Sequence, residues 1–442
     1  MVRTRSRLCF CEPSILGGLP ANSVEAFKKL SVFGLGKLGA CLAATLAQRG
    51  FEVVGVDVNP ESVRRIQAGL PPVDEPFLAE TMAQTGGRLR ADTDPAAALE
   101  TDASFFIVPS PSLPDGSFSN EFLMRAIAPV ARLVKKARKK NHVFVVNSTT
   151  TPGDCARVLI PLIEQEIGGK CGTRFGFAYN PEFIALGNVV RGLLAPDLVL
   201  IGESDARTGD RLEALYHAYN TNQPKIARMS VTSAELTKIS VNSYITAKIS
   251  FTNQLRMIAG QYADTDIHAI LDAIGADSRI GHKYLRAGLS YGGPCFPRDN
   301  RLVSYAARRV GLEAPLAEAT DRVNELAKQQ LVQQALEQVS PGDTVAVLGL
   351  SYRPDTHIVE ESAGLHIAQA LKRGGCQVLV HDFAATTRNS PALLEFENLE
   401  DLALLRKRRR LKAVLICCPW PGYRDVAIPA SARLFDPWGV RA

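Results

Sequence analysis

One cysteine, Cys295, lies in a segment whose composition restricts the backbone, since residues 291–300 read Tyr-Gly-Gly-Pro-Cys-Phe-Pro-Arg-Asp-Asn. The two glycines allow the chain to approach another group closely, and the two prolines stiffen it on both sides of the sulfur. A cysteine attacks carbonyl carbon as the thiolate, and Arg298 and Asp299 can tune its pKa and position water. The alternative is a small buried residue in a tight turn.

A second group of candidate residues lies on one long predicted helix, residues 233–261, which has no proline and no glycine before Gly260. Lys238 and Asn242 are one helical turn apart, so their side chains point the same way. A lysine beside a developing oxyanion stabilises it, and an asparagine can orient it. The alternative is a solvated helix face. The same side also carries Glu235, Thr246 and Asn253.

A carboxylate, Glu182, lies in the sequence Asn-Pro-Glu-Phe directly after a predicted strand at residues 175–179. A carboxylate in such a turn can act as a general base when it reaches a substrate. It can equally be a surface acid at the end of a strand. The residues alone leave both interpretations open.

A glycine-rich turn, Gly-Leu-Gly-Lys-Leu-Gly, follows an apolar run and opens a helical stretch at residues 40–49, and a second strand-like run then ends in Asp57. This is the dinucleotide-binding fingerprint, in which the glycines admit a pyrophosphate to the helix N-terminus and the acid accepts the ribose hydroxyls. An acid here repels a ribose phosphate, which favours NAD over NADP. The alternative is a tight strand–helix turn without a ligand. The expected NAD-binding residues are Gly34, Leu35, Gly36, Lys37, Leu38, Gly39 and Asp57.

The composition is that of a large α/β enzyme. A chain of 442 residues exceeds what one hydrophobic core usually serves, so we expect two or three domains. Nine cysteines without regular spacing favour cytoplasmic thiols over a disulfide framework and over a metal site. The net charge of +6 is modest, and the basic clusters accompany no recognition motif, so we expect no nucleic-acid partner. No apolar run reaches the roughly 18 residues of a membrane span, so we expect no membrane partner.

The elements that must position these residues fall into three blocks. Strand-like runs alternate with helical stretches in the first and third blocks, as in doubly wound sheets, and the second is mainly helical. We therefore expect an α/β fold with two doubly wound Rossmann-like domains, joined by a helical central region with a long helix. The expected division is a flexible N-terminal extension (1–29), an NAD-binding domain (30–224), a helical central and dimerisation domain (225–340) and a C-terminal α/β domain (341–442).

Taken together, the motifs resemble the UDP-glucose/GDP-mannose dehydrogenase family over nearly the whole chain from residue 30. The resemblance rests on segments 180–183, 235–242, 277–281, 292–299 and 349–356. It implies a four-electron oxidation of the primary hydroxyl of a nucleotide-linked hexose to a uronic acid, with two NAD. UDP-glucose is the expected substrate, with UDP-N-acetylhexosamine and GDP-mannose as alternatives, and the product would supply a polysaccharide or glycan. The third block would bind the UDP-sugar.

By position, the resemblance implies that Cys295 traps the aldehyde as a thiohemiacetal, which the second oxidation converts to a thioester. Lys238 would stabilise the charged oxygen, and Asn242 would hold the sugar oxygen. Glu182 would assist the water in hydrolysis. The residues that position that water are similar to Thr149 and Asp299.

The resemblance also implies an oligomer, because Arg279 is similar to the arginine that reaches the substrate of a neighbouring subunit. A homodimer or higher homo-oligomer is therefore expected. The implied substrate contacts are Glu182, Phe183, Lys238, Asn242, Arg279, Tyr291, Gly292 and Cys295. The implied NAD contacts also include Pro109, Thr149, Arg298 and Arg353.

The chain departs from the family pattern at several positions. Leu186 and Gln254 stand where many relatives have glutamate, and His357 stands where the family usually shows aspartate. Glu360 replaces an arginine and reverses a charge where NAD or substrate is expected. A second hypothesis is therefore a catalytically weakened homologue that binds NAD or a nucleotide sugar. The retained Cys295 beside the other implied catalytic residues favours the enzyme, because a binder needs no thiol.

Overall fold

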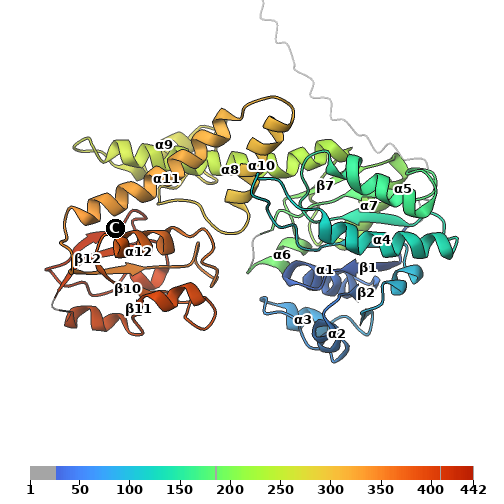
Figure 1. Ribbon diagram of the computed structural model, residues 1–442, viewed down its shortest axis with the longest axis horizontal. Coiled ribbons are helices and arrows are strands. Elements are labelled where there is room, and N and C mark those ends of the chain that lie inside the picture. The colour runs from blue at the N-terminus through green and yellow to red at the C-terminus, as the bar shows by residue number, and fades with distance from the viewer. Residues whose placement is uncertain (1–25, 185–186, 409, 442) are drawn as a thin grey trace, which may run out of the picture.

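The computed structural model describes residues 26–184, 187–408 and 410–441, so most of the expected 1–29 extension, and Leu186, lie outside the described residues. Figure 1 shows two α/β lobes with a group of helices running along one side of both. We call them the N-terminal lobe, around an eight-stranded sheet, and the C-terminal lobe, around a five-stranded sheet. The expected fold class is confirmed.

The strand order of the N-terminal sheet is β3-β2-β1-β4-β5-β6-β7-β8. Neighbouring strands are parallel except β6 and β7, which pair antiparallel. The sequence predicted a parallel sheet throughout, and that was wrong for the last two strands. The connection from β6 to β7 begins and ends at the same sheet edge, so it makes no crossover. The strands are β1 (Lys29–Phe33), β2 (Glu52–Val56), β3 (Leu89–Asp92), β4 (Ala103–Phe106), β5 (Val143–Val146), β6 (Gly176–Tyr179), β7 (Leu198–Glu203) and β8 (Lys225–Ser230).

Helices cover both faces of this sheet. Successive residues of β4, Phe105 and Phe106, are fully buried and enter two different hydrophobic cores, one on each face. Because both faces are buried, the strands are continuous apolar runs rather than alternating ones. The helices are α1 (Lys37–Gln48), α2 (Pro60–Gln67), α3 (Leu78–Ala83), α4 (Glu121–Lys136), α5 (Ile160–Ile167), α6 (Val189–Leu194) and α7 (Ala206–Tyr219).

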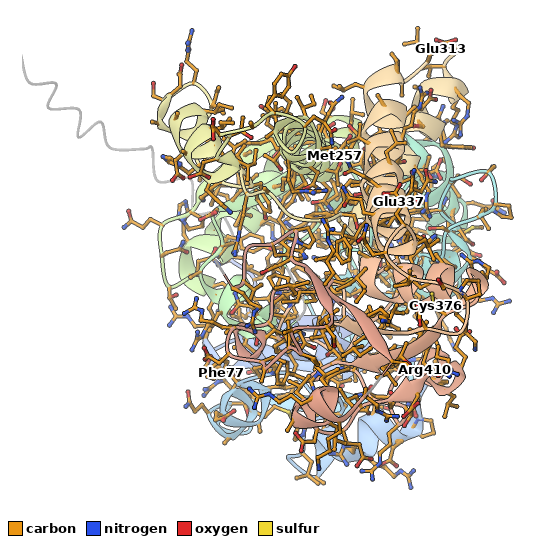
Figure 2. All side chains as sticks on the ribbon, turned by 90° about the vertical axis from the view of Figure 1, so that its left-hand side faces the viewer. Phe77, Met257, Glu313, Glu337, Cys376 and Arg410 are labelled. Carbon is orange, nitrogen blue, oxygen red and sulfur yellow. The ribbon has the colours of Figure 1, made fainter. Side chains whose placement is uncertain are left out.

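Four helices, α8 to α11, form the central region. The predicted long helix is α8, which follows β8 directly and whose N-cap Ser230 accepts a hydrogen bond from Ser233 N. Its buried side includes polar residues that bond to neighbouring helices, for example Ser250, whose hydroxyl donates to Thr320 O at 2.8 Å. Figure 2 shows α11 running from near Glu313, at the top of the view, to Glu337 beside the C-terminal lobe. The helices are α8 (Val231–Ala259), α9 (Ile267–Ala276), α10 (Phe296–Arg309) and α11 (Pro315–Leu336).

The C-terminal sheet has the order β11-β10-β9-β12-β13, with every neighbouring pair parallel. In Figure 2 this lobe faces the viewer and carries the labelled Cys376 and Arg410. Its elements are β9 (Thr344–Leu348), α12 (Ala363–Arg373), β10 (Gln377–His381), β11 (Glu397–Asn398), β12 (Leu411–Ile416) and β13 (Arg433–Phe435). Short 3-10 segments occupy Pro391–Glu395, Leu402–Lys407 and Pro421–Tyr423 in this lobe, and Pro95–Glu100 in the N-terminal lobe.

Two features are absent from the described residues. None of the helices in this part of the chain combines the length and apolar character that crossing a bilayer requires. Within the same residues, no three or more His, Cys, Asp or Glu side chains gather in a way that could hold a metal ion.

Candidate active site

The glycine-rich turn lies between β1 and α1 and has no room for side chains at two of its glycines. Gly34 has φ +94°, and a Cβ there would lie 2.1 Å from Ile107 O. A Cβ on Gly39 would lie 1.8 Å from Gly34 O. Gly36, the N-cap of α1, instead faces open space, and no side chain of the described residues caps this helix. The first N–H groups of α1 are therefore available to an anion such as a pyrophosphate.

Asp57 lies beside this turn at the end of β2. Its carboxylate accepts a hydrogen bond from Leu35 N at 2.5 Å and another from Asn59 N at 2.8 Å. A carboxylate has about four lone-pair positions, so acceptor capacity remains for ribose hydroxyls. The turn, the uncapped helix and the acid therefore fit NAD.

The expected NAD contacts after β4 and on α10 meet at one place. Pro109 is exposed just beyond the end of β4, and the next residue, Ser110, accepts a hydrogen bond from Arg298 Nη2 at 3.0 Å. The Arg298 guanidinium also lies 4.4 Å from the centroid of the Phe118 ring. Its Nε is buried and has no hydrogen-bond partner among the described residues. A free buried donor at this point is available to a polar ligand.

Cys295 is the N-cap residue of α10, and part of its surface is open to solvent. A helix N-terminus favours a thiolate. Burial among protein atoms nevertheless raises the pKa of the thiol, as does the Asp299 carboxylate, while Lys238 and Arg298 act in the opposite direction. At neutral pH the thiol is therefore protonated before ligands bind.

Lys238, Asn242 and Asp299 form a buried polar group next to this thiol, with exposures of 7%, 9% and 3%. Asn242 Nδ2 donates to Asp299 Oδ2 at 2.6 Å. Lys238 Nζ lies 3.9 Å from the same oxygen, which is too long for a hydrogen bond, so the ammonium keeps donors for another acceptor. Burial raises the pKa of Asp299, and Lys238 opposes that shift.

Glu182 follows β6 on the same sheet edge as the glycine turn, because β1, β4, β5 and β6 are all parallel. Burial raises the pKa of its carboxyl to about 7, and Lys238 acts against that shift. Its Oε1 is buried and unpaired within the described residues. Phe183 next to it packs under Lys238, with Nζ 4.9 Å from the ring centroid. A carboxyl that titrates near neutral pH suits a general base.

The segment before the thiol, residues 291–294, contacts the C-terminal lobe and is called the thiol loop below. A Cβ on Gly292 would lie 2.4 Å from Glu361 O, and one on Gly293 would lie 2.7 Å from the Tyr352 ring. Gly293 N donates to Glu360 O at 3.0 Å. The sulfur-bearing segment of the central region therefore packs on the C-terminal lobe.

Three family models match the chain in succession. They are described as the NAD binding domain, the central domain and the UDP binding domain of the UDP-glucose/GDP-mannose dehydrogenase family, and they match residues 28–220, 232–326 and 346–440. The chain is 34% identical to the UDP-glucose 6-dehydrogenase AglM of Haloferax volcanii, over 81% of this chain and 84% of that protein. The chain belongs to the UDP-glucose/GDP-mannose dehydrogenase family.

Other members agree with this placement. The GDP-mannose 6-dehydrogenase of Pseudomonas aeruginosa is 34% identical over 80% of this chain and 81% of that protein. The structure of a UDP-glucose dehydrogenase from the archaeon Pyrobaculum islandicum superposes with a TM-score of 0.86 at 34% identity, covering 96% of this chain and 97% of that one. The expected family is confirmed, and NAD is its cofactor.

Other residues implied by the family resemblance have partners within the protein. Tyr291 is buried, and its hydroxyl donates to Asp321 on α11 rather than into open space. Arg279 is exposed after α9 and pairs with Asp277 at 2.6 Å. Arg353 lies in the C-terminal lobe, where its Nε donates to Tyr352 Oη at 3.0 Å.

The family motifs gave Glu235 no role of its own, although it lies on the polar face of α8. It is fully buried and bonds to the turn after β5 that carries Thr149, itself half-buried. The signal in the sequence was a charged residue one turn before Lys238. Its partners lie 80 to 85 residues away in the chain, so their identity was not predictable.

Proposed function

We propose that this chain oxidises UDP-glucose to UDP-glucuronate in two NAD-dependent steps, through a covalent intermediate on Cys295. The observation that carries the proposal is the solvent-open thiol at the N-terminus of α10, next to the buried group of Lys238, Asn242 and Asp299. A binding protein has no use for this arrangement.

NAD, when bound, would supply the hydride acceptor for both oxidations at C6 of the sugar. Lys238 stabilises the alkoxide that forms as the hydroxyl loses its proton to water, because its ammonium has donors free. Asn242 is held by Asp299 and is oriented to contact the sugar oxygen. The glycine turn and Asp57 would hold the cofactor.

The sulfur of Cys295 then adds to the aldehyde carbon, and the thiol proton passes to the carbonyl oxygen to give a thiohemiacetal. Because burial raises the pKa of the thiol, the sulfur gives up its proton to the carbonyl oxygen as the C–S bond forms. Oxidation of this adduct leaves a thioester. The reactive aldehyde stays bound between the two oxidations.

Hydrolysis completes the reaction. Glu182 takes a proton from a water molecule as the water oxygen attacks the thioester carbon. The C–S bond then breaks, and the sulfur leaves as thiolate and is reprotonated. A carboxyl with a pKa of about 7 is partly ionised at neutral pH, so the rate of this step should rise as pH passes through 7. Thr149 and Asp299 would position the water.

The choice of UDP-glucose rests on two findings. A UDP binding domain model matches residues 346–440, and both AglM and the Pyrobaculum islandicum protein are named for UDP-glucose. The other relatives named for GDP-mannose make that sugar the first alternative, followed by UDP-N-acetylhexosamine.

A homodimer through α8 is part of the same proposal. Large apolar side chains on this helix are exposed, including Tyr244 at 69%, Leu236 at 51% and Phe251 at 49%. Exposed apolar patches of this kind are typical of interfaces. The exposed Arg279 would then reach the partner's substrate, and Tyr244→Lys should shift the sedimentation coefficient towards that of a monomer. A cytoplasmic location is favoured because the seven described cysteines are all free.

The test is NADH release from wild type and Cys295→Ala with UDP-glucose, GDP-mannose and UDP-N-acetylglucosamine. Wild type should release two NADH per UDP-glucose, and the variant should lose this turnover. Absence of NADH with every sugar, together with binding of NAD, would favour a catalytically weakened homologue. The exposed Glu360 near the thiol is the observation behind that second function, since its charge raises the pKa of Cys295.

A further inference from the structure

The turn after β5, residues 148–155, is fastened to α8 by one buried carboxylate. Glu235 is 0% exposed and accepts three hydrogen bonds from this turn. Its Oε1 receives Thr150 Oγ1 at 2.8 Å and Cys155 N at 2.9 Å, and its Oε2 receives Gly153 N at 2.7 Å. Hydrogen bonds to an ionised acceptor are about twice as strong as neutral ones, so this is a firm attachment.

The same turn is also held by α10, the helix that begins just after Cys295. Arg309 Nη1 donates to Asp154 Oδ1 at 2.7 Å, and Asn120 Nδ2 donates to the other oxygen at 2.7 Å. The helix that begins just after the thiol and the helix that carries the lysine of the proposed mechanism therefore both bond to this turn. The attachment to α8 is the deeper of the two, because the Arg309 side chain is 30% exposed.

The position of Glu235 links this turn to the proposed chemistry. It precedes Lys238 by three residues on α8, so both side chains leave the same side of the helix. Thr150, its hydrogen-bond donor, is next to Thr149 in the chain. One side chain thus connects the segment that would position water with the ammonium that would hold the sugar oxygen.

We propose that Glu235 is a positioning residue for thioester hydrolysis, fixing the turn that carries Thr149 against the helix that carries Lys238 and Asn242. This rests on the proposed function. Glu235 does not touch the reacting atoms. Its loss leaves both oxidations possible but displaces the water from the thioester carbon.

Glu235→Gln is the main test. Glutamine has the same shape, but its amide N–H₂ must face at least one of the three donors, so at least one bond is lost. A misplacement of about 1 Å can cost about 100-fold in rate, so we expect hydrolysis to slow by about that factor. UDP-glucose and NAD should then give a burst of NADH, and intact-protein mass spectrometry should show the sugar adduct on the enzyme. Because the adduct accumulates, kcat and KM should fall together, so kcat/KM for both substrates should change less than about three-fold.

Thr150→Val is the second test, because it keeps the carboxylate and removes one donor. It should slow hydrolysis by about 10-fold, the order of one lost hydrogen bond to a charged group. The matched control is Ser250→Ala, a buried residue on the same helix whose hydroxyl bonds to Thr320 O at 2.8 Å. It removes a buried hydrogen bond without touching the turn, so the ratio of hydrolysis to oxidation should stay at the wild-type value.

The outcomes separate this inference from the proposed function. If wild type releases two NADH per sugar and both variants hydrolyse at the wild-type rate, the positioning role is wrong and the function stands. The same holds if the variants slow oxidation and hydrolysis equally, as a general loss of structure would. If wild type releases no NADH with any sugar, both ideas are overturned. Should Glu235→Gln fail to fold, Thr150→Val decides the matter alone.

Discussion

The two lobes contain the same backbone device at the carboxyl end of their first strand. Gly34 after β1 and Gly349 after β9 both have φ +94°. In each lobe a glycine of the following helix packs against the carbonyl of the first: a Cβ on Gly39 would lie 1.8 Å from Gly34 O, and one on Gly364 would lie 2.0 Å from Gly349 O. Close approach of helix to strand explains both pairs.

An acid at the end of the second strand also occurs in both lobes, but the two acids are used differently. Asp57 bonds to Leu35 N and Asn59 N, and its remaining acceptor capacity can meet a ribose. Asp382 bonds to Leu350 N, to the N and Oγ of Ser351 and to two further backbone N–H groups. The first acid has capacity left for a ligand, and the second is committed to holding its own turn.

The N-termini of the helices that follow the two turns also differ: one is open to a ligand and the other is not. Helix α1 starts directly after Gly36, without a side-chain cap. Helix α12 starts after the inserted residues 350–362, and its N-cap Ser362 accepts a hydrogen bond from Leu365 N. The insertion reaches the thiol loop, where Glu361 O and the Tyr352 ring lie against the glycines. The turn in the N-terminal lobe thus presents a helix N-terminus to an anion. The corresponding segment in the C-terminal lobe is longer and extends to the thiol loop.

The largest effects are expected from matched substitutions of the packed glycines. Gly39→Ala and Gly364→Ala each place a Cβ within about the same short distance of a backbone carbonyl, so each should lower the free energy of unfolding by about 3 kcal/mol. Only Gly39→Ala should also weaken NAD binding, by about 100-fold, because it displaces the phosphate-binding turn. Urea unfolding and NAD titration check this. Equal loss of NAD binding in both variants would contradict the division of roles.

Replacing the two acids should have different effects: one substitution weakens cofactor binding, and the other lowers stability. Asp57→Ala should raise the KM for NAD by about 10-fold or more, with little effect on sugar binding, because one or two hydrogen bonds to a charged group are lost. Asp382→Ala should leave that KM unchanged but cost about 3 kcal/mol of stability, since it leaves five donors without their acceptor. Steady-state kinetics with NAD varied and thermal unfolding measure the two effects. Unchanged cofactor kinetics in Asp57→Ala would remove the NAD assignment of the first turn.

The sequence revealed these two turns unequally. The first carries glycine spacing and an acid within one strand–helix–strand unit, so it was predictable. In the second, residues 350–363 separate the glycines, so no fingerprint formed although both strands were predicted. The reversed direction of β7 was also hidden, because an apolar run does not encode which way a strand points. The contacts of Glu235 depend on segments 80 or more residues apart, which only the fold brings together.

Giving α1 a serine N-cap, like the one on α12, tests whether the uncapped N-terminus of α1 is needed for NAD binding. Gly36 has φ −69° and open space around its Cβ position, so Gly36→Ser fits without strain. A serine N-cap is worth only a few tenths of a kcal/mol over glycine, so the melting temperature should rise slightly or stay unchanged. NAD binding should weaken by about 10-fold, because the hydroxyl competes for the N–H groups that a pyrophosphate needs. Isothermal titration with NAD measures this, and unaltered affinity would mean that the cofactor binds elsewhere.

The smallest effect is expected when the cap of α12 is removed. Ser362→Ala loses the bond from Leu365 N, which is 3.2 Å long, and should cost about 1 kcal/mol of unfolding free energy. The KM for NAD should not change, because this helix end faces no cofactor in the proposed arrangement. The reaction of the Cys295 thiol with iodoacetamide should become faster, because loss of the cap loosens the start of α12, where the Ser362 N to Val359 O bond helps to hold the loop that lies on Gly292. A loss of stability without any change in thiol reactivity would show that the loop is held by its own contacts, such as the Arg301–Glu361 ion pair at 2.8 Å, and not by the helix cap.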